Sequence, residues 1–336
     1  MKNVLITGSA GFVGFHLARL LLDKGYRVHG YDGLTNYYDV ALKRERHNIL
    51  QKNSNFTLTE GMLEDENKLY DAADKFQPEI IIHLAAQAGV RYSLENPRSY
   101  LDSNIIGTFN VMEVARKIKI KHLLMASSSS VYGSNSKIPF TEIDKTDSQL
   151  SIYAATKKAN ESMAHSYAHL WKIPTTMFRF FTVYGPWGRP DMALFKFVSA
   201  TINEKPIDIY NNGEMYRDFT YVDDLVRGIY LLLDVVPDLK IENKKLGVDS
   251  HSLVAPYRIV NIGNSRKINL IDFIEAIEEV LGKKAKRNYM PMQKGDVHST
   301  WADASLLRNL TSYSPQTNFK EGIAHFVKWY RNYYNI

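Results

Sequence analysis

The 336-residue sequence contains no cysteine. Disulfide bonds, thiolate metal sites and cysteine nucleophiles are therefore excluded, and a cytoplasmic location is expected because an oxidising compartment has nothing to act on. The chain also lacks a long apolar run, since charge or glycine interrupts each hydrophobic stretch before the roughly 20 residues that span a bilayer. A strand-like run opens directly at Val4, without the pattern of a signal peptide. We expect neither export nor membrane insertion.

A large excess of one charge sign is absent as well. The 42 Lys and Arg residues against 36 Asp and Glu residues give a net charge of +6. The basic cluster 283–287 follows an apolar-periodic stretch, 271–281, where cations complement a helix C-terminus, and no aromatic residue interleaves with it. We therefore expect no nucleic-acid partner. With 45% hydrophobic residues, the chain can bury a large core.

Short β-branched runs alternate with helical patterns through the first half of the chain. This alternation predicts an α/β fold, a doubly wound, Rossmann-like parallel sheet with helices on both faces. The predicted strands are 4–7, 27–31, 56–59, 80–84, 122–127 and 175–181, and helical patterns cover 64–76, 100–118 and 153–171. After Pro186 the pattern loosens, which predicts a first domain over 1–186 and a smaller interleaved domain over 187–336. A strand near 258–263 is expected to return to the first sheet.

A glycine-rich turn follows the first predicted strand and opens the first predicted helix. Gly8, Gly11 and Gly14 permit a tight turn and let the backbone approach a pyrophosphate, which the free N–H groups of the helix start would face. A glycine pattern alone is weak evidence, but Asp32 ends the next strand, 18 residues beyond Gly14. A carboxylate there accepts hydrogen bonds from ribose hydroxyls and repels a 2′-phosphate. The sequence therefore predicts bound NAD rather than NADP.

Tyr153 and Lys157 lie one turn apart on a predicted helix. Such a pair often arises by chance, but here the preceding strand ends in the hydroxyl run 127–130, at the sheet edge where open α/β folds build their sites. A tyrosine with a pKa near 10 needs a shift of about 3 units to be half ionised at neutral pH. Lys157 and an oxidised nicotinamide are the two positive charges expected to supply that shift. Tyr153 would then remove the proton of a substrate hydroxyl while hydride leaves the same carbon.

These motifs, in this order over nearly the whole chain, resemble the extended short-chain dehydrogenase/reductase family, and within it the nucleotide-sugar 4-epimerases. The shared segments are 7–14, Asp32, 83–86, 104–108, 128–133 and 153–157. A narrower similarity to UDP-glucuronate 4-epimerases comes from 36–39, 88–93, 180–192, 255–258 and 293–297. The resemblance implies interconversion of UDP-glucuronate and UDP-galacturonate for polysaccharide biosynthesis, with NAD kept bound.

The resemblance also implies roles for individual residues. Tyr153, Lys157 and Ser128 form the implied catalytic set, and no metal ligand is implied. Ser129, Ser130 and Thr182 would hold the sugar carboxylate. The implied cofactor contacts are Gly8, Gly11, Phe12, Val13, Gly14, Asp32, Asn36, Met62, Leu63, Leu84, Ala85, Ala86, Gln87, Asn104, Tyr153, Lys157 and Phe180. The implied substrate contacts are Arg91, Ser128, Ser129, Ser130, Tyr153 and Thr182, with Arg189, Arg217 and Asp296 facing UDP. A homodimer through the helices near 100–118 and 153–171 is the assembly that the family suggests, although their apolar residues could equally be core.

Oxidation at C4 of a uronate creates a β-keto acid. Such an acid readily loses carbon dioxide unless its carboxylate is held in an orientation from which decarboxylation does not occur. Family members that dehydrate or decarboxylate carry an acidic residue where this chain has Ser130. A hydroxyl is a poor general acid or base near pH 7, so Ser130 favours epimerisation. Gly33 and Met62 depart from the family's usual Asn and Asp, and Met62 packs either on the adenine or in the core.

Three alternatives stay open at the level of sequence. The first is a 4-epimerase of a neutral UDP-sugar, UDP-glucose or UDP-N-acetylglucosamine, against which Thr182 and Arg189 speak. The second is a UDP-glucuronate decarboxylase, which Ser130 disfavours. The third is a non-catalytic NAD-sensing module, which would have no need of Tyr153, Lys157 and Ser128 together.

Overall fold

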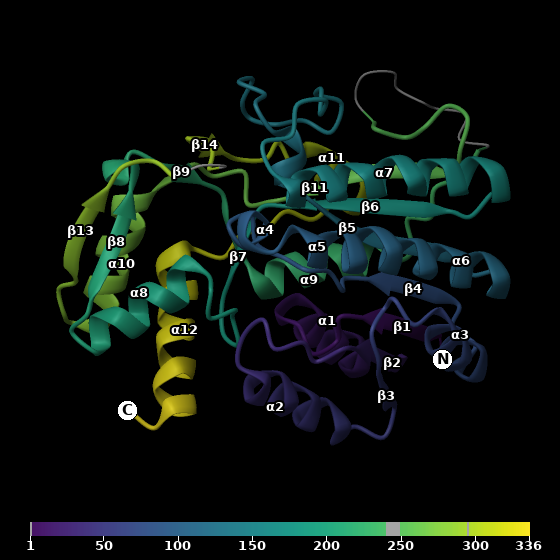
Figure 1. Ribbon diagram of the computed structural model, residues 1–336, viewed down its shortest axis with the longest axis horizontal. Coiled ribbons are helices and arrows are strands. Elements are labelled where there is room, and N and C mark those ends of the chain that lie inside the picture. Colours follow the sequence, from purple (N-terminus) through teal and green to yellow (C-terminus); the bar gives the residue numbers. More distant parts are fainter. Residues whose placement is uncertain (1, 240–248, 294–295) are drawn as a thin grey trace.

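A seven-stranded parallel sheet forms the centre of the computed structural model, which describes residues 2–239, 249–293 and 296–336 (Figure 1). The strand order is β11-β6-β5-β4-β1-β2-β3, and each neighbouring pair is parallel. The strands are β1 (Asn3–Thr7), β2 (Arg27–Asp32), β3 (Phe56–Glu60), β4 (Ile80–His83), β5 (His122–Ser128), β6 (Thr175–Phe180) and β11 (Tyr257–Ile262). The predicted Rossmann-like fold class is confirmed.

Helices cover both faces of this sheet. One face packs against α1 (Phe12–Asp23), α2 (Val40–Gln51), α9 (Val222–Leu232) and α11 (Ser305–Thr311). The other packs against α3 (Glu66–Phe76), α6 (Thr108–Ile118) and α7 (Ile152–Trp171). Between β4 and α6 lie two short helices, α4 (Tyr92–Glu95) and α5 (Pro97–Tyr100), and a π-helical segment, η1 (Leu101–Gly107). A 3₁₀ turn, η2 (Ser129–Tyr132), follows β5.

A smaller lobe has its own core beside the sheet (Figure 1). Its helices are α8 (Ala193–Ile202), α10 (Leu270–Leu281) and α12 (Phe319–Tyr334). Phe219 and Phe273 stack in its core with ring centroids 3.9 Å apart. Its short strands are β7 (Thr182–Tyr184), β8 (Pro206–Tyr210), β9 (Tyr216–Arg217), β10 (Phe219–Tyr221), β12 (Ile268–Asn269), β13 (Lys286–Met290) and β14 (Ser299–Thr300), with the turn η3 (Asn211–Gly213).

The chain passes between the two lobes more than once. After β10 of the smaller lobe, the chain returns to the large sheet as α9. It returns again as β11 and as α11, and all three elements contribute to the hydrophobic core that contains α1. Residues 240–248 of the predicted second domain lie outside the described residues, as do residues 294–295 of the segment 293–297, which carries part of the similarity noted from the sequence. Within the described part of the chain, no helix has the length and apolar character that crossing a membrane requires.

Candidate active site

A cavity opens where the parallel strands end, and residues far apart in the sequence line it together. Most come from the turn after β1, the end of β2, the segment after β3, the loop after β4, the end of β5 and the start of α7, and others from α2, η1, the end of β6 and the segment after it. Of the 17 implied cofactor contacts, 15 line this cavity; Asn36 and Asn104 do not.

The turn between β1 and α1 has the geometry that its glycines predict. Gly8 adopts φ +77°, and a Cβ there would lie 2.6 Å from the backbone nitrogen of Ala85. A Cβ on Gly14 would overlap the carbonyl oxygen of Gly8. Only glycine permits this close packing of strand, turn and helix, which brings the first N–H groups of α1 to the cavity.

Asp32 closes one end of the turn by accepting two backbone hydrogen bonds. Its Oδ2 accepts from Ala10 N at 2.9 Å, and its Oδ1 accepts from Leu34 N at 2.9 Å. The carboxylate is therefore fixed at the end of β2, with lone pairs remaining for a sugar diol. The glycine turn, the helix start and this carboxylate together fit a dinucleotide.

Tyr153, Lys157 and Ser128 meet at the opposite part of the cavity. Ser151 caps α7 by accepting a hydrogen bond from Ala154 N at 3.1 Å, so the helix begins just before Tyr153. Lys157 is buried, and its Nζ donates to the carbonyl of Ala126 at 2.8 Å. This bond fixes the lysine against the end of β5, beside Ser128.

The ionisation of these groups depends on their burial and on the charges around them. Burial raises the pKa of Tyr153, and the nearby Ser128 hydroxyl and the Arg189 guanidinium act against that rise. Arg189 is thus a cation acting on the phenol that the sequence did not predict, and the effect of Lys157 on the phenol stays a prediction. Burial lowers the pKa of Lys157 itself to about 8, while Glu161 acts to raise it. The predicted lowering of the tyrosine pKa therefore does not come from the protein alone.

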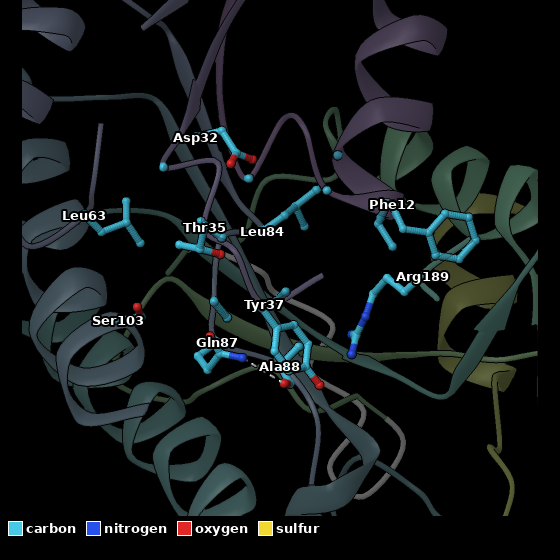
Figure 2. Close-up of a pocket in the computed structure, with 18 of the residues that line it drawn as sticks. Phe12, Asp32, Thr35, Tyr37, Leu63, Leu84, Gln87, Ala88, Ser103 and Arg189 are labelled. Carbon is cyan, nitrogen blue, oxygen red and sulfur yellow. Dashed lines mark hydrogen bonds between the residues drawn. The ribbon is translucent and has the colours of Figure 1, made fainter. Parts of the chain in front are cut away.

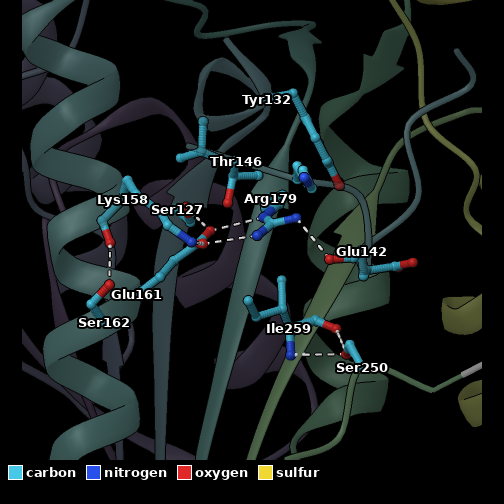
Figure 3. A network of polar contacts seen from close by, with 12 residues as sticks. Ser127, Tyr132, Glu142, Thr146, Lys158, Glu161, Ser162, Arg179, Ser250 and Ile259 are labelled. Atoms are coloured by element: carbon cyan, nitrogen blue, oxygen red, sulfur yellow. Dashed lines mark hydrogen bonds and ion pairs between the residues drawn. The ribbon is translucent and has the colours of Figure 1, made fainter. Parts of the chain in front are cut away.

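A buried polar network supports the serine run from behind (Figure 3). Glu161, two turns after Tyr153 on α7, accepts a hydrogen bond from Ser127 Oγ at 2.6 Å. Arg179 on β6 pairs with both oxygens of Glu161 at 2.8 Å and donates to the Glu142 carbonyl at 3.1 Å. Through these bonds α7, β5 and β6 are held in one arrangement behind the catalytic set.

The implied substrate residues fall into three places. Ser128, Tyr153 and Arg189 line the main cavity, and Thr182 lines a smaller adjoining one with Arg189. Ser129 and Ser130 form the η2 turn, which Ser128 caps by accepting a hydrogen bond from Ser130 N at 3.2 Å.

The third place is a charged cluster contributed by both lobes. Arg91 pairs with Asp296 at 3.0 Å and lies 4.4 Å from the centre of the Tyr210 ring. Burial lowers the pKa of Arg217, whereas Asp296 raises it and Arg91 lowers it further. Asp296 is therefore close to two arginines whose charge it does not fully balance.

Three implied cofactor contacts, Asn36, Asn104 and Met62, differ from the others in exposure or in position relative to the cavity. Asn36 is exposed. Asn104 is fully buried behind the cavity, where its Oδ1 accepts from Gln87 N at 2.8 Å and its Nδ2 donates to Thr156 Oγ1 at 3.1 Å. It thereby links the loop after β4 to α7 without lining the cavity. Met62 lines the cavity and is 42% exposed, so the alternative that it fills the core is wrong.

Tyr37, Lys43 and Thr35 line the cavity but were not among the residues predicted from the sequence, whereas Arg189 was predicted as a substrate contact. Tyr37 and Arg189 approach one another in Figure 2, since both contact Asp191: Tyr37 donates to it at 3.1 Å, and Arg189 donates two hydrogen bonds. Lys43 reaches the cavity from α2 and donates to Thr35 Oγ1 at 3.1 Å. The helix over 40–51, which carries Lys43, is rich in charged residues, and its pattern gave no signal that Lys43 would reach the cavity.

Comparison with known proteins identifies relatives over the whole chain. The family described as GDP-mannose 4,6 dehydratase matches residues 5–326. A probable UDP-glucuronate 4-epimerase of Rhizobium meliloti is 54% identical over 98% of this chain and 97% of its own, and Protein CapI of Staphylococcus aureus is 50% identical over 99% of each. The crystal structure of a UDP-glucuronic acid 4-epimerase from Bacillus cereus, with UDP-glucuronic acid and NAD, superimposes with a TM-score of 0.88 at 31% identity, covering 99% of this chain and 100% of that one.

Proposed function

The chain belongs to the GDP-mannose 4,6 dehydratase family of extended short-chain dehydrogenases/reductases, and from that premise we propose that it is an NAD-dependent 4-epimerase that interconverts UDP-glucuronate and UDP-galacturonate. One observation carries the proposal: Tyr153, Lys157 and Ser128 face the same cavity as the glycine turn and Asp32. A protein that only binds NAD would not need these three side chains at the cofactor cavity.

In the proposed reaction, Tyr153 is the acid and base at the C4 oxygen. It takes the C4 hydroxyl proton as the C4 hydride leaves, and it returns the proton once the sugar has presented its other face. NAD, when bound, supplies the hydride acceptor and donor and an additional positive charge near the phenol. Ser128 orients the same oxygen, and Lys157, fixed by the Ala126 carbonyl, keeps its charge close to the reacting end of the cavity.

The hydroxyl groups of Ser129, Ser130 and Thr182 are proposed to hold the sugar carboxylate. Neutral donors can hold it away from the geometry of decarboxylation without transferring a proton to it. In the proposed division, residues 1–186 bind NAD and residues 187–336 mainly bind the UDP-sugar. Arg217 and Asp296, together with Arg91 from the first part, would hold UDP while the 4-keto sugar turns.

Purified protein incubated with UDP-glucuronate and followed by NMR tests the proposal. We expect UDP-galacturonate to appear without net formation of NADH. A pentose product would instead indicate a decarboxylase, and turnover of UDP-glucose or UDP-N-acetylglucosamine alone would indicate a neutral-sugar epimerase. Absence of any turnover with NAD bound would favour the sensing module.

We also propose a homodimer in the cytoplasm. Large apolar side chains are exposed along η1 and α6 and at the end of α7, a pattern that marks association surfaces when the residues gather. They are Leu101, Ile106, Phe109, Leu170 and Trp171, with exposures from 42% to 62%. Sedimentation equilibrium at micromolar concentration would distinguish a dimer from a monomer.

A further inference from the structure

The segment after β3 carries an acidic residue whose pairing is incomplete. Glu64 lines the main cavity and accepts a hydrogen bond from Ser103 Oγ at 3.1 Å through Oε1. Its Oε2 is shielded from solvent and has no hydrogen-bond partner among the described residues. Buried polar atoms nearly always have a partner, so this unpaired acceptor, on a residue that lines the cavity, points to a donor that the carboxylate can meet by turning toward the cavity.

The neighbouring acidic residues do not share this property. Asp65 caps α3 by accepting a hydrogen bond from Lys68 N at 3.1 Å, and Glu66 pairs with Lys117 at 2.7 Å. Neither Asp65 nor Glu66 lines the cavity. Glu64 is therefore singled out by its position and by its spare oxygen, rather than by belonging to an acidic stretch.

The segment that carries Glu64 is held firmly in place. Asn110 donates to the Leu63 carbonyl at 2.8 Å, and Tyr31 donates to the Met62 carbonyl at 3.0 Å. A Cβ on Gly107 would lie 2.6 Å from Cβ of Leu63, so glycine is needed for this approach. The carboxylate itself can turn, because the last torsion of glutamate is broad and exchanges its two oxygens. A fixed backbone with a rotatable carboxylate suits a binding contact.

The sheet order tells which part of a ligand Glu64 faces. Ser128 ends β5 on one side of β1, whereas on the other side Asp32 ends β2 and Glu64 lies just after β3. Figure 2 shows Leu63, which directly precedes Glu64, and Ser103, its hydrogen-bond partner, on the side of the cavity away from Phe12 and Arg189. A dinucleotide centred on the glycine turn, with its reactive ring near Tyr153, places its adenosine half toward Glu64.

We infer that Glu64, oriented by Ser103, accepts a hydrogen bond from the exocyclic amino group of adenine and thereby selects adenine over a 6-oxopurine. The inference rests on the proposed function, because it requires bound NAD. Adenine presents an amino donor where hypoxanthine presents a carbonyl oxygen, which a carboxylate repels. Met62, beside Glu64, offers only a thioether, a weak acceptor.

Competition between two dinucleotides tests this inference without measuring turnover. The full-length protein is incubated with equal amounts of NAD and nicotinamide hypoxanthine dinucleotide until the bound ratio is constant, and the bound nucleotides are separated and quantified. A hydrogen bond to a charged acceptor corresponds to about a ten- to hundredfold preference, so wild type should retain at least about ten NAD molecules for each analogue. Glu64→Gln should bring the ratio near one, because its amide can donate to the carbonyl.

Glu66→Gln is the matched control, the same substitution outside the cavity, and it should keep the wild-type ratio. Equal binding of the two dinucleotides by wild type would overturn the inference without any variant, as would a Glu64→Gln ratio equal to that of wild type. If wild type bound neither dinucleotide, the proposed function would fail and this inference with it.

Discussion

Arg179 and Glu161 form a bidentate ion pair that is almost completely buried, with each side chain only 2% exposed. Two nitrogens of the guanidinium meet the two carboxylate oxygens at 2.8 Å, and Ser127 donates to the same carboxylate. The pair joins β6 to the helix that carries Tyr153 and Lys157. The ion pair therefore helps to fix the position of the helix that carries the catalytic residues.

Glu161→Gln should destabilise the protein strongly. Removing one partner of a buried ion pair leaves the other charge uncompensated, which costs about 3–5 kcal/mol of the free energy of unfolding. Urea denaturation measures this loss. Glu161→Leu combined with Arg179→Met should lose less than Glu161→Gln alone, because no buried charge remains; a double variant that is less stable than the single one would contradict this account.

Tyr153→Phe should lower kcat by about 10²–10⁴-fold, the range that general acid–base catalysis contributes. The ring is retained, so the content of bound NAD should not change. Kinetics with UDP-glucuronate and quantification of bound nucleotide check the two parts. Tyr289→Phe, at a half-exposed tyrosine that does not line the cavity, should behave as wild type. Retained turnover in Tyr153→Phe would refute the role assigned to the phenol.

Ser130→Ala and Thr182→Val should each increase the fraction of pentose product. Loss of a hydroxyl leaves the carboxylate of the 4-keto sugar freer to reach the geometry in which carbon dioxide departs. Mass spectrometry of the product mixture gives the ratio of pentose to hexuronate. Ser134→Ala, at an exposed serine just beyond the motif, serves as the control. Slower epimerisation with no pentose in either variant would argue against carboxylate holding.

Acid should destabilise the protein through buried histidines. Burial lowers the pKa of His83 to about 3, and burial likewise lowers the pKa of His122 to about 4. The unfolded chain, with a histidine pKa near 6.5, binds protons in this range that the folded chain does not. The free energy of unfolding therefore falls as pH drops from about 6.5 toward 4, by up to about 1.4 kcal/mol per pH unit for each histidine.

Denaturation midpoints between pH 7 and pH 4 check this expectation. His83→Gln should show a shallower decline, because one of these groups is gone while a polar side chain still faces Thr7 and Thr108, the two hydroxyl partners of His83. An identical slope in wild type and variant would mean that His83 does not contribute.

The fold class and most of the cavity wall follow from the order and spacing of residues along the chain. Spacing along one strand, turn and helix is a local property, so it is sufficient to place Gly8, Gly14 and Asp32. The i, i+4 relation of Tyr153 and Lys157 is local in the same way. That Tyr153 and Lys157 lie near Ser128 can also be predicted from the sequence, because the carboxyl ends of parallel strands meet at one edge of a sheet.

Contacts between distant segments, in contrast, are set by how the elements pack. Asn104 resembles a cofactor contact in sequence, but the π-helical segment before α6 buries it behind Gln87. Arg189, from the loop after β7, lines the same cavity as Tyr153 and acts to lower the pKa of its phenol. Glu64 and Ser103 are 39 residues apart and meet only through packing. Desolvation and charge pairing depend on three-dimensional distance, and for such distant residues sequence spacing does not encode that distance.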